Sequence, residues 1–424
     1  MDERIYREYV AILKEELQPA MGCTEPIAVA YCAALARKTL GALPETVEVL
    51  ASANIIKNVK SVIVPNTNGQ RGIAAAAAAG IISDNADAQL QVLASLTPEQ
   101  VDAVGAYLRQ AAFTVRRADK DYVFDIQVRV TAGADSASVE IAGYHTNVIR
   151  IEKNGVVQFH KDYQESGSQH ATDRSLLTVE QIIAFANEVD IADVQETLQR
   201  QIDYNWAIAE EGLRGDYGAN IGRILLQSYG MSIHNRAKAY AAAGSDARMN
   251  GCDLPVVINS GSGNQGLTAS LPVIVYAKEL GVTQQMLYRA LVVSNLVTIH
   301  LKTGIGSLSA YCGATAAGCG AAAGVTYLYG GQFREIAHTV VNAIAIDSGM
   351  ICDGAKASCA AKIASAVEAG LLGMQMQMHE SQFYGGDGIV VKGVENTIRN
   401  IGTLASEGMR ETDRTIIRMM IHEH

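Results

Sequence analysis

Three cysteines in the last third of the chain have a spacing that could hold an iron–sulfur cluster. Cys312 is followed after 39 residues by Cys352, and six more residues separate Cys352 from Cys359. Thiolates are the usual protein ligands of such clusters. Three of them would leave one iron of a four-iron cluster without a protein ligand, and an open iron is a Lewis acid that can draw a leaving group from a small molecule.

The spacing of the cysteines alone leaves alternatives to a cluster open. The pattern is wider than the compact four-cysteine runs of ferredoxins, and free cysteines often serve only as small buried hydrophobic residues. Cys319 and Cys252 compete for the position of a fourth ligand. Within the C-x6-C segment, Gly354 would let the backbone wrap closely around a cluster, and Lys356 could offset its negative charge.

Another cysteine, Cys23, lies in the segment MGCTEP at 21–26, directly before a helical pattern. Unpaired N–H groups and the helix dipole at a helix N-terminus favour a thiolate. Cys23 could therefore be a nucleophile, a base or a thiol that contacts substrate. An ordinary buried cysteine in a capping loop is the structural alternative.

A polar, glycine-rich segment, NSGSGNQG at 259–266, could bind an anion. Its letters match the GxGxxG pattern of dinucleotide-binding folds, but no βαβ unit surrounds them. Successive backbone N–H groups, together with Ser260, Ser262 and Asn264, are better suited to grip a substrate carboxylate. A plain turn between helices is the structural alternative.

Two further segments carry polar side chains of interest. In AGYHTN at 142–147, His145 could be an acid–base group or an orienting donor, or a structural histidine with satisfied hydrogen bonds. In SDAR at 245–248, Arg248 could bind a carboxylate or pair with Asp246.

The composition excludes several classes of function. The chain has 424 residues, 49% of them hydrophobic, and a formal net charge of -10, which predicts a globular protein of two or three domains, or one large one, without a nucleic-acid or anionic-membrane partner. The uncharged stretch 303–333 is built from small residues, which predicts a packed helical core in place of a membrane span. A charged N-terminus without a signal-like apolar core and seven cysteines suit the cytoplasm.

Hydrophobic periodicity predicts an α+β fold in which a smaller β-containing domain is inserted near the N-terminus of a large Ala/Gly-rich helical domain. We expect N-terminal helices in 1–43 that pack on the helical domain, a small α/β domain at 44–160 and a helical catalytic domain at 161–424.

Within these ranges, the pattern predicts helices at 3–17 and 72–82, a strand at 46–56, and a helix capped by Thr24 that follows GCTEP. Another helix begins at Thr97-Pro98-Glu99. Alternation with a period of two between 121 and 160 predicts three antiparallel strands, in the segments 121–133, 136–155 and 156–162, with a hairpin turn at Asn154-Gly155. A polar loop is expected at 162–175.

The segments GCTEP, GYHTN, SDAR, NSGSGNQG and SGMICDGAKASC occur in this order. On these segments, over essentially the whole chain, the sequence resembles the L-cysteine desulfidase family, which is related to the α chain of the iron–sulfur L-serine dehydratases. The resemblance implies a pyridoxal-independent lyase with an oxygen-labile [4Fe-4S] cluster that converts L-cysteine to pyruvate, ammonia and hydrogen sulfide.

The resemblance also implies roles for individual residues. The family's cluster cysteines match Cys312, Cys352 and Cys359, its N-terminal cysteine matches Cys23 as base or substrate contact, and Cys319 is not matched. The remaining candidates for binding a small amino-acid substrate are Thr24, Glu25, His145, Asn147, Arg248, Ser260, Ser262 and Asn264.

Two alternatives to the desulfidase reaction remain. The same open iron could carry off hydroxide in L-serine dehydration. The C-x6-C spacing of the last two cysteines favours the desulfidases, because the related serine dehydratases have more residues between these two ligands. A non-enzymatic iron–sulfur sensor is the other alternative, and no DNA-binding element supports it. A homo-oligomer is possible in each case.

Overall fold

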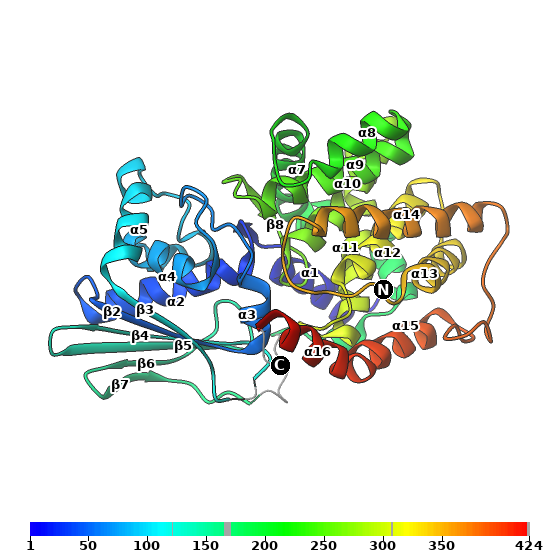
Figure 1. Ribbon diagram of the computed structural model, residues 1–424. Helices are drawn as coiled ribbons and strands as arrows, with labels where there is room; N and C mark the ends of the chain where they lie inside the picture. The colour runs from blue at the N-terminus through cyan, green and yellow to red at the C-terminus, as the bar shows by residue number, and fades with distance from the viewer. Residues whose placement is uncertain (121, 165–170, 307, 422–424) are drawn as a thin grey trace.

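The computed structural model describes residues 1–120, 122–164, 171–306 and 308–421. The chain forms a part built around a six-stranded sheet and a larger helical part beside it (Figure 1). Each part has its own hydrophobic core. The expected α+β fold with a helical majority is confirmed.

The six-stranded sheet has the strand order β3-β2-β4-β5-β6-β7, in which β2 and β3 are parallel and the other pairs are antiparallel. Alternate residues of its central strands, such as Val47, Val49, Ile126 and Val128, are buried, as expected for a sheet covered on one face. The strands are β2 (Thr46–Ala51), β3 (Ala112–Arg117), β4 (Asp125–Ala132), β5 (Asp135–Ala142), β6 (Val148–Lys153) and β7 (Val156–His160).

Helices α2 and α4 cover that face of the sheet (Figure 1). They approach closely because Gly80 of α4 lies against the backbone of Ala30 of α2, where a Cβ atom would come within 1.9 Å of the Ala30 oxygen. The helices of this part are α2 (Thr24–Leu40), α3 (Ala53–Val59), α4 (Gly72–Ser83), the 3₁₀ helix η1 (Ala86–Gln91) and α5 (Pro98–Gln110).

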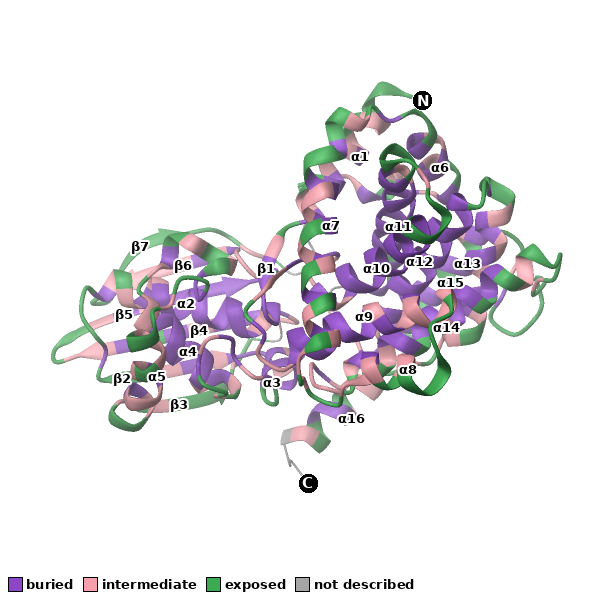
Figure 2. Cartoon of the chain, turned by 90° about the horizontal axis from the view of Figure 1, so that it is seen from above, coloured by how far each residue is buried: buried purple, intermediate pink, exposed green. Residues whose placement is uncertain are grey.

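The helical part is organised around α10, α11 and α12, which Figure 2 shows as largely buried. Its α-helices are α1 (Glu3–Glu16), α6 (Val179–Glu188), α7 (Ile191–Arg214), α8 (Ile221–Tyr229), α9 (Ile233–Met249), α10 (Gly263–Leu280), α11 (Gln284–Ile305), α12 (Gly313–Leu328), α13 (Phe333–Asp347), α14 (Cys359–Met378), α15 (Val394–Thr403) and α16 (Arg410–Ile421). The short elements are β1 (Pro19–Met21), β8 (Pro255–Val257), which pairs with β1, the 3₁₀ helix η2 (Arg174–Leu176) and the π-helical turn η3 (Leu404–Gly408).

The uncharged stretch forms α12 and packs inside this bundle. Cβ atoms added at Gly318 and Gly320 would come within 2.4 Å of the Ala366 oxygen and 2.0 Å of the Thr298 hydroxyl, so the small residues are required for helix contact. Among the described helices, none is long and apolar enough to cross a membrane.

Several locally determined elements agree with the sequence. Tyr9, Ile12 and Leu13 are buried along α1 as its periodicity predicts, and Thr97 caps α5 through a reciprocal capping box with Gln100. The turn at 154–155 has both residues at positive φ, as a two-residue hairpin requires. Part of the polar loop expected at 162–175, namely 165–170, lies outside the described residues.

Other expectations were wrong. The strand expected at 46–56 ends at Ala51, because Ser52 caps α3 by accepting a hydrogen bond from Ile55 N. The stretch 136–155 is two strands, β5 and β6, because Gly143 at φ +83 turns the chain between them. The sequence pattern also missed β3, whose residues are mostly exposed and therefore do not alternate.

The second N-terminal helix also differs from expectation. Cys23, with Thr24 already inside the helix, is the N-cap of α2, and no side chain makes the capping hydrogen bond. Of the two helices, only α1 packs on the helical part. Helix α2 packs on the sheet, because the buried alanines and Ile27 of α2 belong to the hydrophobic core of the sheet-containing part. The N-terminus of α2 consequently points toward the junction between the two parts.

Candidate functional site

A cavity of about 110 Å³ lies at this junction and brings most of the candidate residues together. Four of its lining residues come from the sheet-containing part and the others from the helical part. The candidate residues in its wall are Cys23, Glu25, Arg248, Ser262, Asn264, Cys312, Cys352 and Cys359. Residues more than 300 positions apart in sequence therefore share one small enclosed space.

The three cysteines of the C-x39-C-x6-C pattern occupy well-defined positions in that wall. Cys312 is the N-cap of α12, and Cys359 is the first residue of α14. Cys352 lies in the connecting loop, which pairs with the segment before α12: Cys312 N donates to Met350 O at 3.0 Å, and Cys352 N donates to Ala310 O at 2.6 Å. This short pairing holds two of the thiols side by side.

The electrostatics favour a negative charge on one of the three thiols, that of Cys352. A hydrogen bond between the two side chains lowers the pKa of Cys352 to about 5 and raises the pKa of Cys312, so the pair shares one proton. The ammonium groups of Lys57 and Lys302 also lower the pKa of Cys352. Burial raises the pKa of Cys359, against the opposing effect of nearby lysines.

The loop between Cys352 and Cys359 is shaped by Gly354. Its φ is +90°, and a Cβ atom there would come within 2.4 Å of the carbonyl oxygen of Lys57, so glycine is required for the close approach. Lys356 donates to the Asp353 and Gly354 carbonyl oxygens and is not in the cavity wall.

The lysines that do line the cavity are Lys57, Lys302 and Lys362. Lys302 is almost fully buried, and burial lowers its pKa to about 8 although Cys352 and Cys312 oppose that shift. Lys362 is hydrogen-bonded to Asp353. Three ammonium groups around three thiols provide the positive surroundings that an anionic group needs in a buried position.

Four helix N-termini also face the cavity. The N-cap residues of α2, α10 and α12 are Cys23, Ser262 and Cys312, and α14 begins at Cys359; all four line the wall. Each N-terminus contributes unpaired N–H groups and a partial positive charge. The arrangement stabilises thiolates, an anionic cluster or a carboxylate in the same space.

Cys23 is joined to Glu25 at the start of α2. Its Sγ donates to Glu25 Oε2 at 3.3 Å, and Thr24 Oγ1 lies 3.1 Å from the same oxygen. Burial and the Glu25 charge raise the pKa of Cys23 well above its ordinary value, so the thiolate expected from helix position is not favoured in this state. Burial opposes ionisation of Glu25, but His145, a backbone hydrogen bond and Arg248 lower its pKa overall.

Arg248 forms the part of the wall that can bind a carboxylate. Its side chain is 2% exposed, Nη1 donates to Asn264 Oδ1 at 3.0 Å, and Nε has no partner among the described residues. It packs on Gly263, where a Cβ atom would come within 2.2 Å of Nε. Asp246 does not pair with it and instead accepts a hydrogen bond from Gly222 N at 3.0 Å.

The segment 259–262 is a tight turn that leads into α10. Asn259 and Ser262 exchange two backbone hydrogen bonds, and Ser262 caps the helix by accepting from Gln265 N. Ser260, at φ +50°, donates to Asn259 Oδ1 at 2.8 Å and does not line the cavity. The predicted carboxylate nest therefore reduces to Ser262, Asn264 and the helix N-terminus.

Three other candidates lie behind the wall. His145 packs edge-on against Phe124 and beside Gly261, and its buried Nε2 has no partner within the part of the chain that the structure describes. Burial lowers the pKa of His145. Thr24 Oγ1 lies 2.9 Å from Gly261 O and so links the two parts. Asn147 donates to Ala142 O at 2.7 Å and accepts from Lys161, which stabilises the turn between β5 and β6.

The sequence did not single out several residues of the wall, chiefly Lys57, Asn58, Gln265 and Lys302. Lys57 and Asn58 directly follow the segment 46–56 that was expected to be a strand, and they belong to α3. Once α3 is recognised, two adjacent buried polar residues on a short helix would be a signal. Lys302 directly precedes the uncharged stretch 303–333, and this is a weaker signal.

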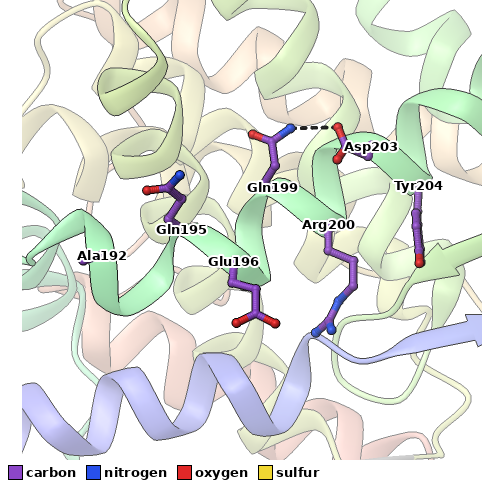
Figure 3. Close-up of a pocket in the computed structure, with 7 residues that line it drawn as sticks. All are labelled: Ala192, Gln195, Glu196, Gln199, Arg200, Asp203 and Tyr204. Atoms are coloured by element: carbon purple, nitrogen blue, oxygen red, sulfur yellow. Dashed lines mark hydrogen bonds between the residues drawn. The ribbon is translucent and has the colours of Figure 1, made fainter.

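A second, wider hollow of about 630 Å³ lies on the surface of α7 (Figure 3). All of its lining residues come from that helix, and none is a cysteine or histidine. Gln199 Nε2 donates to Asp203 Oδ1 at 2.7 Å, and Arg200 donates to Leu17 O, so these polar groups already serve the helix surface. The enclosed cavity at the junction is the better candidate for chemistry despite its smaller volume.

The thiols of the cavity wall are not gathered around one point. Within the described residues, no three Cys, His, Asp or Glu side chains are gathered closely enough to hold one metal ion. A single ion needs its ligands around one point, whereas a cubane cluster takes sulfur ligands at separate corners. Three half-buried thiols, three lysines and a glycine cradle are consistent with such a cluster.

Comparison with known proteins places the chain in a family. Residues 87–418 match the family described as serine dehydratase alpha chain, and this range includes all three cysteines of the pattern. The protein therefore belongs to the serine dehydratase alpha-chain family, and membership implies an enzyme of the dehydratase or lyase type.

Relatives extend the similarity over the full length. A UPF0597 protein of Desulfitobacterium hafniense is 57% identical over 99% of this chain and 98% of its own. UPF0597 proteins of Lachnoclostridium phytofermentans and Treponema denticola are 49% and 44% identical, over 99% and 100% of this chain and the whole of their own lengths.

Proposed function

We propose that the protein is a [4Fe-4S] lyase that converts L-cysteine to pyruvate, ammonia and hydrogen sulfide. The observation that carries the proposal is the convergence of Cys312, Cys352 and Cys359 on a cavity that also contains Cys23 and Arg248. When bound by three thiolates, the cluster supplies one iron with an open position, which acts as a Lewis acid toward a departing sulfur.

The residues of the chain would perform the remaining steps. Arg248, Ser262 and the N-terminus of α10 bind the substrate carboxylate. Cys23 takes the α-proton of the substrate as a thiolate, having lost its own proton before the substrate binds, and its contact with the ionised Glu25 orients the sulfur.

The proposed reaction balances without a redox partner. The substrate loses its α-proton and its β-sulfur as sulfide, and the electron pair of the broken C–H bond forms the double bond of 2-aminoacrylate. That product tautomerises to an imine and hydrolyses in water to pyruvate and ammonia. Because iron–sulfur clusters with an open iron are oxygen-labile, we expect the protein to work in a reducing compartment such as the cytoplasm.

L-Serine dehydration is the second candidate, and the family match favours it. The same residues would act, but hydroxide would leave in place of sulfide. The two candidates differ only in the leaving group, sulfide from cysteine or hydroxide from serine.

The experiment that separates the two supplies L-cysteine and L-serine at equal concentrations to protein reconstituted with iron and sulfide without oxygen. Pyruvate is the common readout, and sulfide is measured with cysteine. Pyruvate with equimolar sulfide from cysteine, at a rate above that from serine, supports the desulfidase. Pyruvate from serine alone assigns dehydration, and neither product from fully loaded protein contradicts both.

A further inference from the structure

Asn58 has a hydrogen-bond acceptor that no described protein group uses. Its Nδ2 donates to Glu25 Oε1 at 3.0 Å, and because an ionised carboxylate only accepts, this contact fixes which end of the amide faces Glu25. Asn58 Oδ1 therefore lies on the other side, where it is buried and has no partner among the described residues. The side chain is 6% exposed and lines the cavity.

A second unused acceptor lies in the same wall. Gln265 Oε1 is also buried without a partner, and its side chain is held against Gly313, where a Cβ atom would come within 2.8 Å of that oxygen. Buried polar atoms are normally paired, so unpaired ones need a reason, such as a ligand. Asn58 Oδ1 and Gln265 Oε1 are thus two buried acceptors without a partner among the described residues, and the Glu25 carboxylate lines the same cavity. Arg248 Nε, in the same wall, is a buried donor without such a partner.

The inventory of unused groups is complementary to one kind of molecule. A group that presents only N–H donors would pair with the two acceptors, and a carboxylate would pair with Arg248. An α-amino acid carries both groups on one carbon atom, and its ammonium has three donors. Lys57, the neighbour of Asn58, is already paired with Asp413 Oδ1 at 2.5 Å, which reduces the repulsion it exerts on a bound ammonium.

We propose that Asn58 Oδ1, together with Gln265 Oε1, forms a subsite for the α-ammonium group of the substrate. The inference rests on the amino-acid lyase function proposed above and adds to it a requirement for a free amino group. A carboxylic acid without an amino group would leave both acceptors buried and unpaired, so the site would reject it.

Binding of L-alanine and of propionate to cluster-loaded protein tests this subsite, with calorimetry performed without oxygen. Both ligands carry a carboxylate and neither has a leaving group, so turnover does not affect the result. We expect wild-type protein to bind alanine at least about tenfold more tightly, since a hydrogen bond to a charged group is lost with propionate. Asn58→Leu should bring the two affinities close to each other.

Asn54→Leu is the matched control, because Asn54 lies on the same helix, has a buried unpaired Oδ1 and does not line the cavity. It should retain the preference for alanine. Gln265→Met should reduce the preference and gives an independent reading if Asn58→Leu does not fold. Full preference in the Asn58 and Gln265 variants, or no preference in the wild type, overturns the subsite. Failure of the lyase proposal would be seen in a different measurement. In that case neither cysteine nor serine would yield pyruvate, whatever the affinity for alanine.

Discussion

Lys57 Nζ lies 2.5 Å from Asp413 Oδ1, and this ion pair fastens α16 to α3 at the wall of the cavity. The Lys57 side chain is 1% exposed and that of Asp413 is 15% exposed. Lys60 on the same helix donates to Met420 O near the end of α16. The last helix of the chain therefore holds in place the helix that supplies Lys57 and Asn58 to the cavity, as the adjacency of α3 and α16 in Figure 1 illustrates.

Asp413→Asn should destabilise the protein, because it leaves the Lys57 ammonium buried without its anionic partner. Removal of one partner from a buried pair costs about 3 kcal/mol. The free energy of unfolding in urea measures the effect. Glu411→Gln on the same helix is the control, since its pair with Arg414 is exposed and its loss should change stability by less than about 0.5 kcal/mol. Equal small effects from both variants would show that the pair does not hold α16 in place.

Cys23→Ala should retain the cluster but lose turnover, because Cys23 lines the cavity without belonging to the three-cysteine set. Loss of an acid–base group lowers the rate by about 10²–10⁴-fold. Pyruvate formation and iron content are measured on the same preparation. Normal turnover in this variant would rule out Cys23 as the base, and loss of iron would make it a cluster ligand.

The stability of the protein should depend on pH through Asp246. Burial raises the pKa of this carboxyl to about 6, above its value in the unfolded chain. Its contribution to stability is therefore complete below pH about 4 and is lost as the pH rises through about 6. Asp246→Asn lacks this dependence, so its Tm relative to wild type should rise between pH about 4 and 7. A constant difference in Tm across that range would contradict the shift.

Local sequence features predicted what local interactions determine. The face of α1, the Thr97 cap and the turn at 154–155 depend on residues within a few positions of each other, and all three are confirmed. The end of β2 was missed because Ser52 caps a helix whose buried residues, such as Ile55, continue the apolar character of the strand.

At the site, too, residue type and local sequence predicted some of the residues, while others depend on contacts between distant parts of the chain. The three cysteines and Arg248 could be selected from residue type and segment, and they line one cavity. Asn58 could not, because its significance depends on the contact with Glu25, 33 positions away in sequence. The charge state of Cys23 also depends on burial between two parts of the fold, which overrides the tendency of a helix N-terminus to favour a thiolate.

The most direct test of the account asks whether turnover depends on the three thiols that line the cavity. Iron content and pyruvate formation from L-cysteine and L-serine would be measured for wild type, Cys352→Ala and Cys319→Ala after identical reconstitution without oxygen. Cys319 is the control because it is buried in α12 and does not line the cavity. We predict that Cys352→Ala loses both the cluster and pyruvate formation, while Cys319→Ala keeps both. A fully loaded, active Cys352→Ala variant would contradict the assignment of the cluster to this cavity.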